Sequence, residues 1–513
     1  AWKVIGYSED NGNTWTTTKP AWLKSLTKES GNGGTAAEQG TATLGTDIVD
    51  LVAKRNKELQ DSKPLGSAET PYNLSNSAGK AQVQNTANCY VISAPGYYMI
   101  PLVYGNAIKD NNANYVAYQF SGSAGYINVN GQQKENILPK LVDHDGKGIN
   151  NPWIEKTNNN ANNGIDGAQI VWADEANLVN LDSNPIYRDG NGNAFVKFEV
   201  TQANIKSGNA VIAVKKGNTI VWSWHLWFAP KNALDKIPVT NKQNKVYNFT
   251  SEALGWKPTK WTGTSYSTPR TVKVKVEQTI ANNGVKQTTV ITITQNAGIT
   301  ERRGNTTLYQ WGRKDPFPST DPAVGTLFKK DAGNQIYMQA IIQNPGYFYV
   351  TEGGSTIPGS SYLTRYYYFY NLWSVNNTET NGNDNAVVKT IYDPSPVGFQ
   401  VPASNAFTGF TSNGVNQGTK MVDGTEVPAT YNSQTGHIFW TNSEKKATIY
   451  FPATGFRENG NGNMVSLNVS ANYWTAIPQD LNNGRCFAFS QADVYPLYSS
   501  ARTYGLGVRP VAE

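Results

Sequence analysis

Residues 270–295 read RTVKVKVEQTIANNGVKQTTVITITQ, and this stretch decides the class of fold. Polar and apolar side chains largely alternate over 270–280 and again over 286–295. Alternation of this kind has the period of a β-strand with one buried and one solvated face. The Asn-Asn-Gly sequence at 282–284 is a turn signal, so the two runs predict a β-hairpin.

The rest of the 513 residues supports a mainly β chain. Aromatic residues make up 12% and charged residues 16%, against about 25% charged residues in an average globular protein. Many short strands joined by turns suit this composition. Further strands are predicted at 169–172, 194–200, 210–214 and 219–228. Eight or more short strands imply a β-sandwich, and the length implies several domains.

Charge and cysteine content exclude some classes of function. The net charge is +6, and no basic run is longer than Lys329-Lys330 or Arg302-Arg303, so no nucleic-acid partner is expected. The two cysteines, Cys89 and Cys486, are too few for a disulfide scaffold or a cysteine-based zinc site. Both are predicted to be small buried hydrophobes. No stretch approaches the roughly 20 apolar residues of a membrane helix.

One amphipathic helix is predicted over 46–60, with Thr46 or Asp47 as its cap. Residues 1–75 also contain a Trp-rich strand start, the sequence PAWL at 20–23 and a Ser/Gly-rich turn. This pattern resembles BACON-type immunoglobulin-like modules of Bacteroidetes surface proteins. Since the chain begins inside a predicted strand, it is expected to be a mature or trimmed chain without its leader.

Two longer phrases carry a second resemblance, which covers most of residues 76–300. They are TANCYVISAPGYYMIPLVYGNAIK at 86–109 and GNAVIAVKKGNTIVWSWHLWF at 208–228. They resemble the central β-domain of Bacteroidales fimbrillin-like cell-surface lipoproteins. The resemblance implies an immunoglobulin/transthyretin-like β-sandwich in this range.

The proline-rich stretch DPSPVGFQVP at 393–402 and the ending GVRPV at 507–511 mark residues 301–513. Proline excludes helix and central strand there, so a rigid loop is predicted. In this order the motifs resemble the Fibrobacter succinogenes major paralogous domain, which implies a C-type-lectin-like α+β fold and a short helix after Ser404, capped by it. Ser395 and Pro510 stand where many relatives have cysteine. The loop is therefore expected to be held by proline geometry and packing.

These resemblances imply a cell-adhesion protein, a fimbrial tip or accessory subunit exported to the outer membrane as a lipoprotein. Its expected partners are other pilus subunits, joined by strand addition, and a surface ligand such as a glycan. It would contact the membrane only through a lipid anchor outside this sequence. Two alternatives stay open, a glycan-binding lipoprotein for polysaccharide capture and a glycan-active hydrolase. Neither enzyme activity nor a cofactor is expected.

Few residues suggest chemistry. His225, in the strand predicted at 219–228, is expected to be a satisfied core histidine, and His144 to lie in a polar loop. The loop RDGNGN at 188–193 begins like a calcium loop but lacks the required later ligands, so a hairpin turn is predicted. Aromatic residues could instead stack sugar rings or fill a core. The candidate ligand-binding residues are Tyr366, Tyr368, Trp373 and Trp474.

Overall fold

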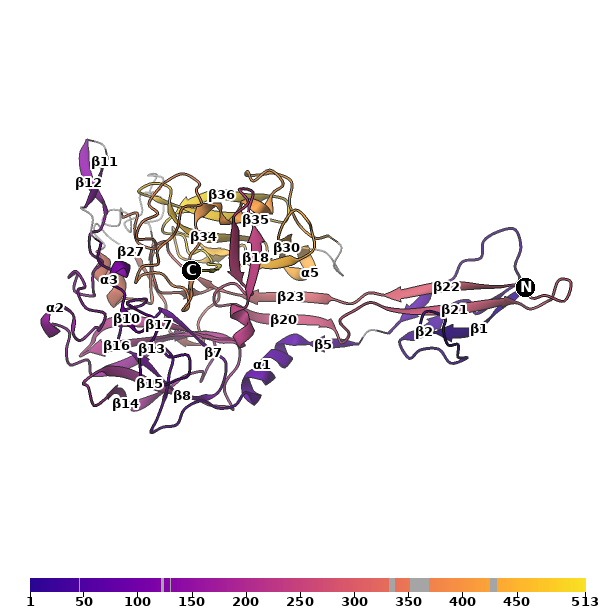
Figure 1. Ribbon diagram of the computed structural model, residues 1–513, viewed down its shortest axis with the longest axis horizontal. Coiled ribbons are helices and arrows are strands. Elements are labelled where there is room, and N and C mark those ends of the chain that lie inside the picture. Colours follow the sequence, from indigo (N-terminus) through magenta and orange to yellow (C-terminus); the bar gives the residue numbers. More distant parts are fainter. Residues whose placement is uncertain (46, 121–123, 130, 332–336, 351–368, 425–430) are drawn as a thin grey trace. The chain divides into compact units, whose positions relative to one another are not determined.

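The computed structural model describes residues 1–45, 47–120, 124–129, 131–331, 337–350, 369–424 and 431–513 (Figure 1). The chain is mainly β, which confirms the predicted class. It divides into two compact units. Unit 1 comprises Ala1–Val52, Lys260–Arg302 and Gly424–Gln434, and unit 2 comprises Ala53–Thr259, Arg303–Asp423 and Thr435–Glu513.

Unit 1 is built on the predicted hairpin. Strands β21 (Arg270–Gln278) and β22 (Thr288–Gln295) pair antiparallel, which confirms that prediction. They belong to a sheet of order β22-β21-β1-β3, completed by β1 (Trp2–Ser8) and β3 (Ser30–Gly31). A second small sheet pairs β2 (Leu23–Leu26) with β4 (Ala42–Leu44). The buried residues between them are Tyr7, Trp22, Leu23, Val272 and Val274.

Unit 2 contains two sheets, most of whose strands are labelled in Figure 1, and the two sheets share one hydrophobic core. The first has the order β26-β13-β16-β17-β7 and the second β14-β15-β8-β6. Their bounds are β26 (Val324–Gly325), β13 (Gly167–Ala173), β16 (Gly208–Lys216), β17 (Thr219–Phe228), β7 (Cys89–Ile92), β14 (Asn180–Arg188), β15 (Ala194–Val200), β8 (Gly96–Pro101) and β6 (Tyr72–Asn73).

Strand β17 lies inside its sheet and is buried on both faces. It follows a tight turn in which Gly217 has a φ of 59°, a backbone conformation that suits glycine. Its histidine is a core residue, as predicted: His225 Nε2 lies 2.8 Å from Asn209 Oδ1. Burial without a charged partner lowers the pKa of His225 to about 3, so this ring is neutral at physiological pH.

Residues 301–513 join the same unit through a sheet of order β18-β19-β37-β29. Strands β18 (Lys236–Thr240) and β19 (Val246–Thr250) come from the middle of the chain, and β29 (Phe399–Gln400) and β37 (Val511–Ala512) come from its last third. The predicted domain boundary near residue 300 therefore lies between segments that share one sheet and one core. The division of the chain into modules at 1–75, 76–300 and 301–513 stays a prediction from the sequence resemblances.

Three further sheets complete the last third of unit 2. Strands β34 (Ser470–Pro478), β35 (Asn483–Ser490) and β36 (Val494–Ala501) form a three-stranded antiparallel sheet. Strand β30 (Gly436–Trp440) pairs with β31 (Thr448–Pro452), and β32 (Phe456–Arg457) with β33 (Met464–Val465). Phenylalanines from these strands and from the helical turn η3 (Ser404–Phe410) pack together between them, with Phe407 stacked on Phe487 at 4.8 Å.

The other elements are short. In unit 2 they are β9 (Ile108–Lys109), β10 (Asn112–Ala113), β11 (Gly125–Val129), β12 (Gln132–Ile137), β24 (Thr307–Leu308), β25 (Phe317–Pro318), β27 (Phe328–Asp331), β28 (Tyr347–Val350), α2 (Thr157–Asn160), α3 (Met338–Gln343), η1 (Tyr115–Ala117) and η2 (Lys231–Leu234). Strand β5 (Ile48–Asp50) and α5 (Tyr431–Gln434) belong to unit 1, and β20 (Lys257–Thr264) and β23 (Ile299–Asn305) have most of their residues in it.

Two helix predictions need correction at their first residues. The predicted helix forms as α1 (Leu51–Asp61), but it begins later because residues 48–50 pair with β20 as strand β5. Asp50, rather than Asp47, accepts a hydrogen bond from the first turn, at Val52 N, and Thr46 lies outside the described residues. The turn η3 is a 3-10 helix that begins at Ser404 itself, whose hydroxyl oxygen accepts a hydrogen bond from Asn383 N instead of capping it.

Candidate functional site

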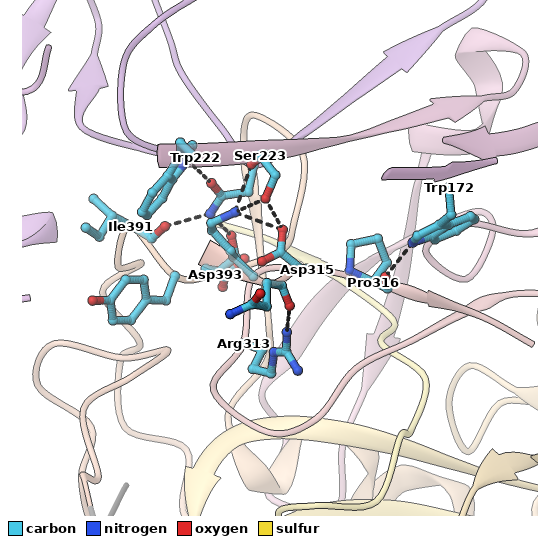
Figure 2. A network of polar contacts seen from close by, with 12 residues as sticks. Trp172, Trp222, Ser223, Arg313, Asp315, Pro316, Ile391 and Asp393 are labelled. Atoms are coloured by element: carbon cyan, nitrogen blue, oxygen red, sulfur yellow. Dashed lines mark hydrogen bonds and ion pairs between the residues drawn. The ribbon is translucent and has the colours of Figure 1, made fainter. Parts of the chain in front are cut away.

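A buried polar cluster places a serine hydroxyl beside a lysine and an aspartate (Figure 2). Ser223 Oγ donates to Asp315 Oδ1 at 2.5 Å, and Lys314 Nζ donates to Ser223 Oγ at 2.6 Å. Burial lowers the pKa of Lys314, although Asp315 opposes this. All three residues are at most 4% exposed, so no substrate reaches the hydroxyl. The cluster joins β17 to the segment after β24 and is structural.

The proline-rich loop is held by buried charges that sequence reasoning missed. Asp393 accepts hydrogen bonds from Ser395 N at 2.7 Å and Val401 N at 2.9 Å. Lys389 Nζ donates to the carbonyl of Pro396 at 3.0 Å. Burial raises the pKa of Asp393, and the nearby charge of Lys389 works against that rise. The expectation that proline geometry and packing hold this loop was therefore incomplete.

The aromatic residues predicted to bind a ligand do not form a surface platform where the structure describes them. Trp373 and Trp474 are 0% exposed. Each indole N–H donates to a backbone carbonyl, Trp373 to that of Tyr392 and Trp474 to that of Tyr309. These two indoles belong to the core, because their polar atoms are satisfied inside the protein. Tyr366 and Tyr368 lie outside the described residues.

A hollow on the sheet β34-β35-β36 is the best candidate for a binding site. Its volume is about 480 Å³, within the range of about 300–1,000 Å³ typical of small-molecule sites. We call it the tyrosine hollow. It is lined by Phe456, Ser470, Asn472, Asn483, Ala488, Phe489, Ser490, Tyr495, Tyr498, Ser499, Ser500, Ala501, Tyr504 and Leu506.

Strand alternation explains why these side chains face the hollow. Along β34, Ser470 and Asn472 are half-buried, while the alternating residues Ala471 and Tyr473 are buried, and Tyr473 contacts Phe451 of the phenylalanine core. Asn472 lies opposite Ala488 in the neighbouring strand. The small methyl group of Ala488 leaves room above the sheet, so the amide and hydroxyl groups around it line an open space.

Tyrosines supply the aromatic part of the lining. The rings of Tyr495 and Tyr498 lie 5.4 Å apart with a tilt of 57°, and Tyr498 is 42% exposed. Both come from β36, where an irregularity in the pairing with β35 falls between Cys486 and Ala488. That irregularity brings two tyrosines three positions apart into one lining, which regular alternation would not do.

A loop outside the sheet holds the backbone of β36 and the side chain of Tyr495 in position. The side chain of Asn416 pairs with the backbone of Leu497 in both directions: Leu497 N donates to Asn416 Oδ1 at 2.9 Å, and Asn416 Nδ2 donates to the carbonyl of Leu497 at 3.1 Å. Gln417 Nε2 donates to the hydroxyl of Tyr495 at 3.1 Å. This brace holds the ring of Tyr495 in place before any ligand arrives.

Unit 1 offers a second candidate surface, the outer edge of β22. This strand pairs with β21 over eight residue pairs without a register shift, and the other side of β22 pairs with no strand in the described chain. Its sequence TTVITITQ contains no charge and no proline. Beside it lies a hollow of about 210 Å³, whose lining includes the apolar residues Val274, Ile291 and Ile293 and also Lys28 and Glu38.

Other sequence candidates carry no site. His144 is 5% exposed, and burial lowers its pKa. At 188–193 the chain forms a hairpin turn between β14 and β15, as predicted, with Asp189 accepting hydrogen bonds from Asn191 N and Asn193 N. The described residues contain no group of three or more His, Cys, Asp or Glu placed to hold a metal ion. Among the described helices, none has the length and apolar character needed to cross a membrane.

Comparisons with protein-family models, with curated proteins and with solved structures found no match.

Proposed function

We propose that this chain is a non-catalytic adhesion protein of a bacterial cell surface that binds saccharides through the tyrosine hollow. The observation that carries the proposal is the make-up of the hollow: exposed Tyr498 and half-buried Tyr495 beside amide and hydroxyl groups on one sheet. The sequence resemblances to Bacteroidales surface lipoproteins support the same class and an outer-membrane location. Immunoglobulin-like and C-type-lectin-like folds for its parts belong to this proposal.

The chemistry of the lining suits a sugar. A saccharide presents apolar C–H faces and a ring of hydroxyls, and tyrosine offers an apolar face with a polar tip. The amide of Asn472 can both donate and accept, and its present contact with Ser500 Oγ is long, at 3.5 Å. A ligand hydroxyl can therefore replace that contact at little cost.

Binding of the full chain to a glycan array, followed by titration calorimetry with the saccharides that bind, tests the proposal. Tyr498→Ala removes an exposed ring, and Asn472→Ala removes the amide. Each variant is expected to weaken binding about ten-fold, the loss of one good polar or stacking contact. Tyr126→Ala is the matched control, because Tyr126 is 57% exposed on β11, outside the hollow.

Loss of binding in the two hollow variants with unchanged binding by the control supports the proposal. If the wild-type chain binds none of the neutral and acidic glycans on the array, the proposal is contradicted. Equal binding by wild type and both hollow variants places the saccharide elsewhere and also contradicts it.

A second candidate function, fimbrial assembly by strand addition, is favoured by the edge of β22. Exposed edges with neither charge nor proline readily accept another strand, and apolar side chains of that strand would enter the neighbouring hollow. Ile291→Lys is expected to abolish incorporation of the chain into surface polymers of the bacterium that produces it. Val285→Lys, at the exposed hairpin turn, is the matched control and should assemble normally. Normal assembly of Ile291→Lys would contradict this function.

A further inference from the structure

We infer that the tyrosine hollow selects neutral saccharides over acidic ones. This inference rests on the proposed saccharide binding and adds the class of ligand. It follows from the charges of the lining and of the side chains next to it.

The lining contains no Lys, Arg, His, Asp or Glu. A carboxylate or sulfate group of an acidic sugar would therefore lose water in the hollow without gaining a charged partner. Desolvating an ion without such compensation is costly, whereas the hydroxyls of a neutral sugar find matching amide and hydroxyl groups. The cost of desolvating an acidic group in this uncharged lining by itself favours neutral saccharides.

The nearby cations are directed elsewhere. Arg485 lies on β35 but is not part of the lining, and its Nε donates to the carbonyl of Thr380 at 2.6 Å. Arg502 follows β36, and its guanidinium donates to the carbonyls of Phe369 and Asp480. Neither arginine lines the hollow.

Two acids lie beside the lining. The carboxylate of Asp480 accepts hydrogen bonds from Asn483, a lining residue, and Arg485 nearby partly balances its charge. Glu458 directly follows β32, two positions after the lining residue Phe456, and its carboxylate accepts a hydrogen bond from Asn461 Nδ2 at 3.0 Å. Burial raises the pKa of the lining residue Tyr504, and the charge of Glu458 adds to that rise. Repulsion from Glu458 therefore also lowers the affinity for acidic sugars.

The test compares a neutral oligosaccharide that the chain binds with the same oligosaccharide carrying one sialic acid or sulfate group. Titration calorimetry of the wild-type chain should show the acidic form binding at least about ten-fold more weakly. Glu458→Gln should narrow that gap about two- to five-fold, the effect of one exposed charge at close range in water, and leave the neutral affinity unchanged. Ser499→Lys, which adds a cation to the lining, should reverse the preference.

Equal affinity of the wild-type chain for both forms overturns the inference while leaving the proposed saccharide binding intact. Absence of binding to any saccharide overturns the proposed function instead. An unchanged preference in both Glu458→Gln and Ser499→Lys, with neutral binding retained as proof of folding, also overturns the inference, because the ligand then does not meet these side chains.

Discussion

The side-chain amide of Asn88 donates a hydrogen bond of 2.8 Å to the backbone carbonyl of Asp393, 305 residues further along the chain. The same amide donates to the carbonyl of Ile391, and its oxygen accepts from Trp222 Nε1. One buried residue thus connects β17, the start of β7 and the proline-rich loop.

Replacing Asn88 is expected to destabilise unit 2 strongly. Asn88→Ala leaves two buried carbonyls and an indole N–H without partners, and each unsatisfied group costs about 1–3 kcal/mol. We expect a loss of about 3–5 kcal/mol in the free energy of unfolding, measured by urea denaturation. Asn112→Ala, on the exposed two-residue strand β10, is the matched control and should change stability by less than about 0.5 kcal/mol. A loss below about 1 kcal/mol at position 88 would show that water replaces the amide.

The effect on stability of removing the charge of Lys389 should depend on whether Asp393 is still charged. Both residues are buried, and Lys389→Met leaves the carboxylate without its nearby cation, a change expected to cost about 3–5 kcal/mol. The double variant Lys389→Met with Asp393→Asn removes both charges and should be more stable than Lys389→Met alone. Denaturant unfolding of the wild type, the two single variants and the double variant gives the free energy of interaction between the two side chains. Strictly additive losses would show that the two charges do not interact.

Residues 76–300 and 301–513 are expected not to fold as separate chains. Separation would expose the shared core and leave β19 without β37, which pairs with it through Phe249 and Val511. Each fragment alone should bind a hydrophobic dye and show no cooperative thermal transition, whereas the full chain should show one. A cooperative transition in either isolated fragment would contradict this expectation.

Acid should destabilise unit 2 through two buried histidines. Burial lowers the pKa of His225 to about 3 and that of His437 to about 4, from an ordinary value near 6.5. The unfolded chain therefore binds more protons than the folded chain below pH 6.5, and stability falls as pH falls through this window. From pH 7 to pH 5 each histidine should cost about 2 kcal/mol.

Unfolding in urea at pH 7 and pH 5 measures this loss. His437→Gln keeps a donor for the carbonyl of Ser490, which His437 Nε2 contacts at 2.8 Å. This variant should lose about 2 kcal/mol less between the two pH values than the wild type does. An identical loss in both proteins would show that His437 is not the titrating group.

Local pattern was enough to predict much of the β structure. The hairpin of β21 and β22, the strand β17 and the helix α1 all follow from periodicity and turn residues within one segment. The first residue of α1 was missed because residues 48–50 pair with β20, more than 200 residues away. Such long-range pairing leaves no signal in the segment itself.

The candidate site was not predictable in the same way. An aromatic-rich sequence is equally suited to a core and to a binding surface, and only burial distinguishes Trp373 from Tyr498. The tyrosine hollow depends on an irregularity between two strands and on a brace from Asn416, neither of which is a local pattern. A hint was available in the sequence YPLYSS at 495–500, where two tyrosines precede small polar residues.

The sequence by itself determined the class of fold, the main hairpin and the rigid loop at 393–402, because alternation, turn residues and proline act within a few positions. Tertiary structure alone decided which residues became buried charges, which aromatics filled the core and where a hollow remained. These outcomes depend on contacts between segments hundreds of residues apart, and the free energy of a buried charge or an open lining is set by its neighbours in space.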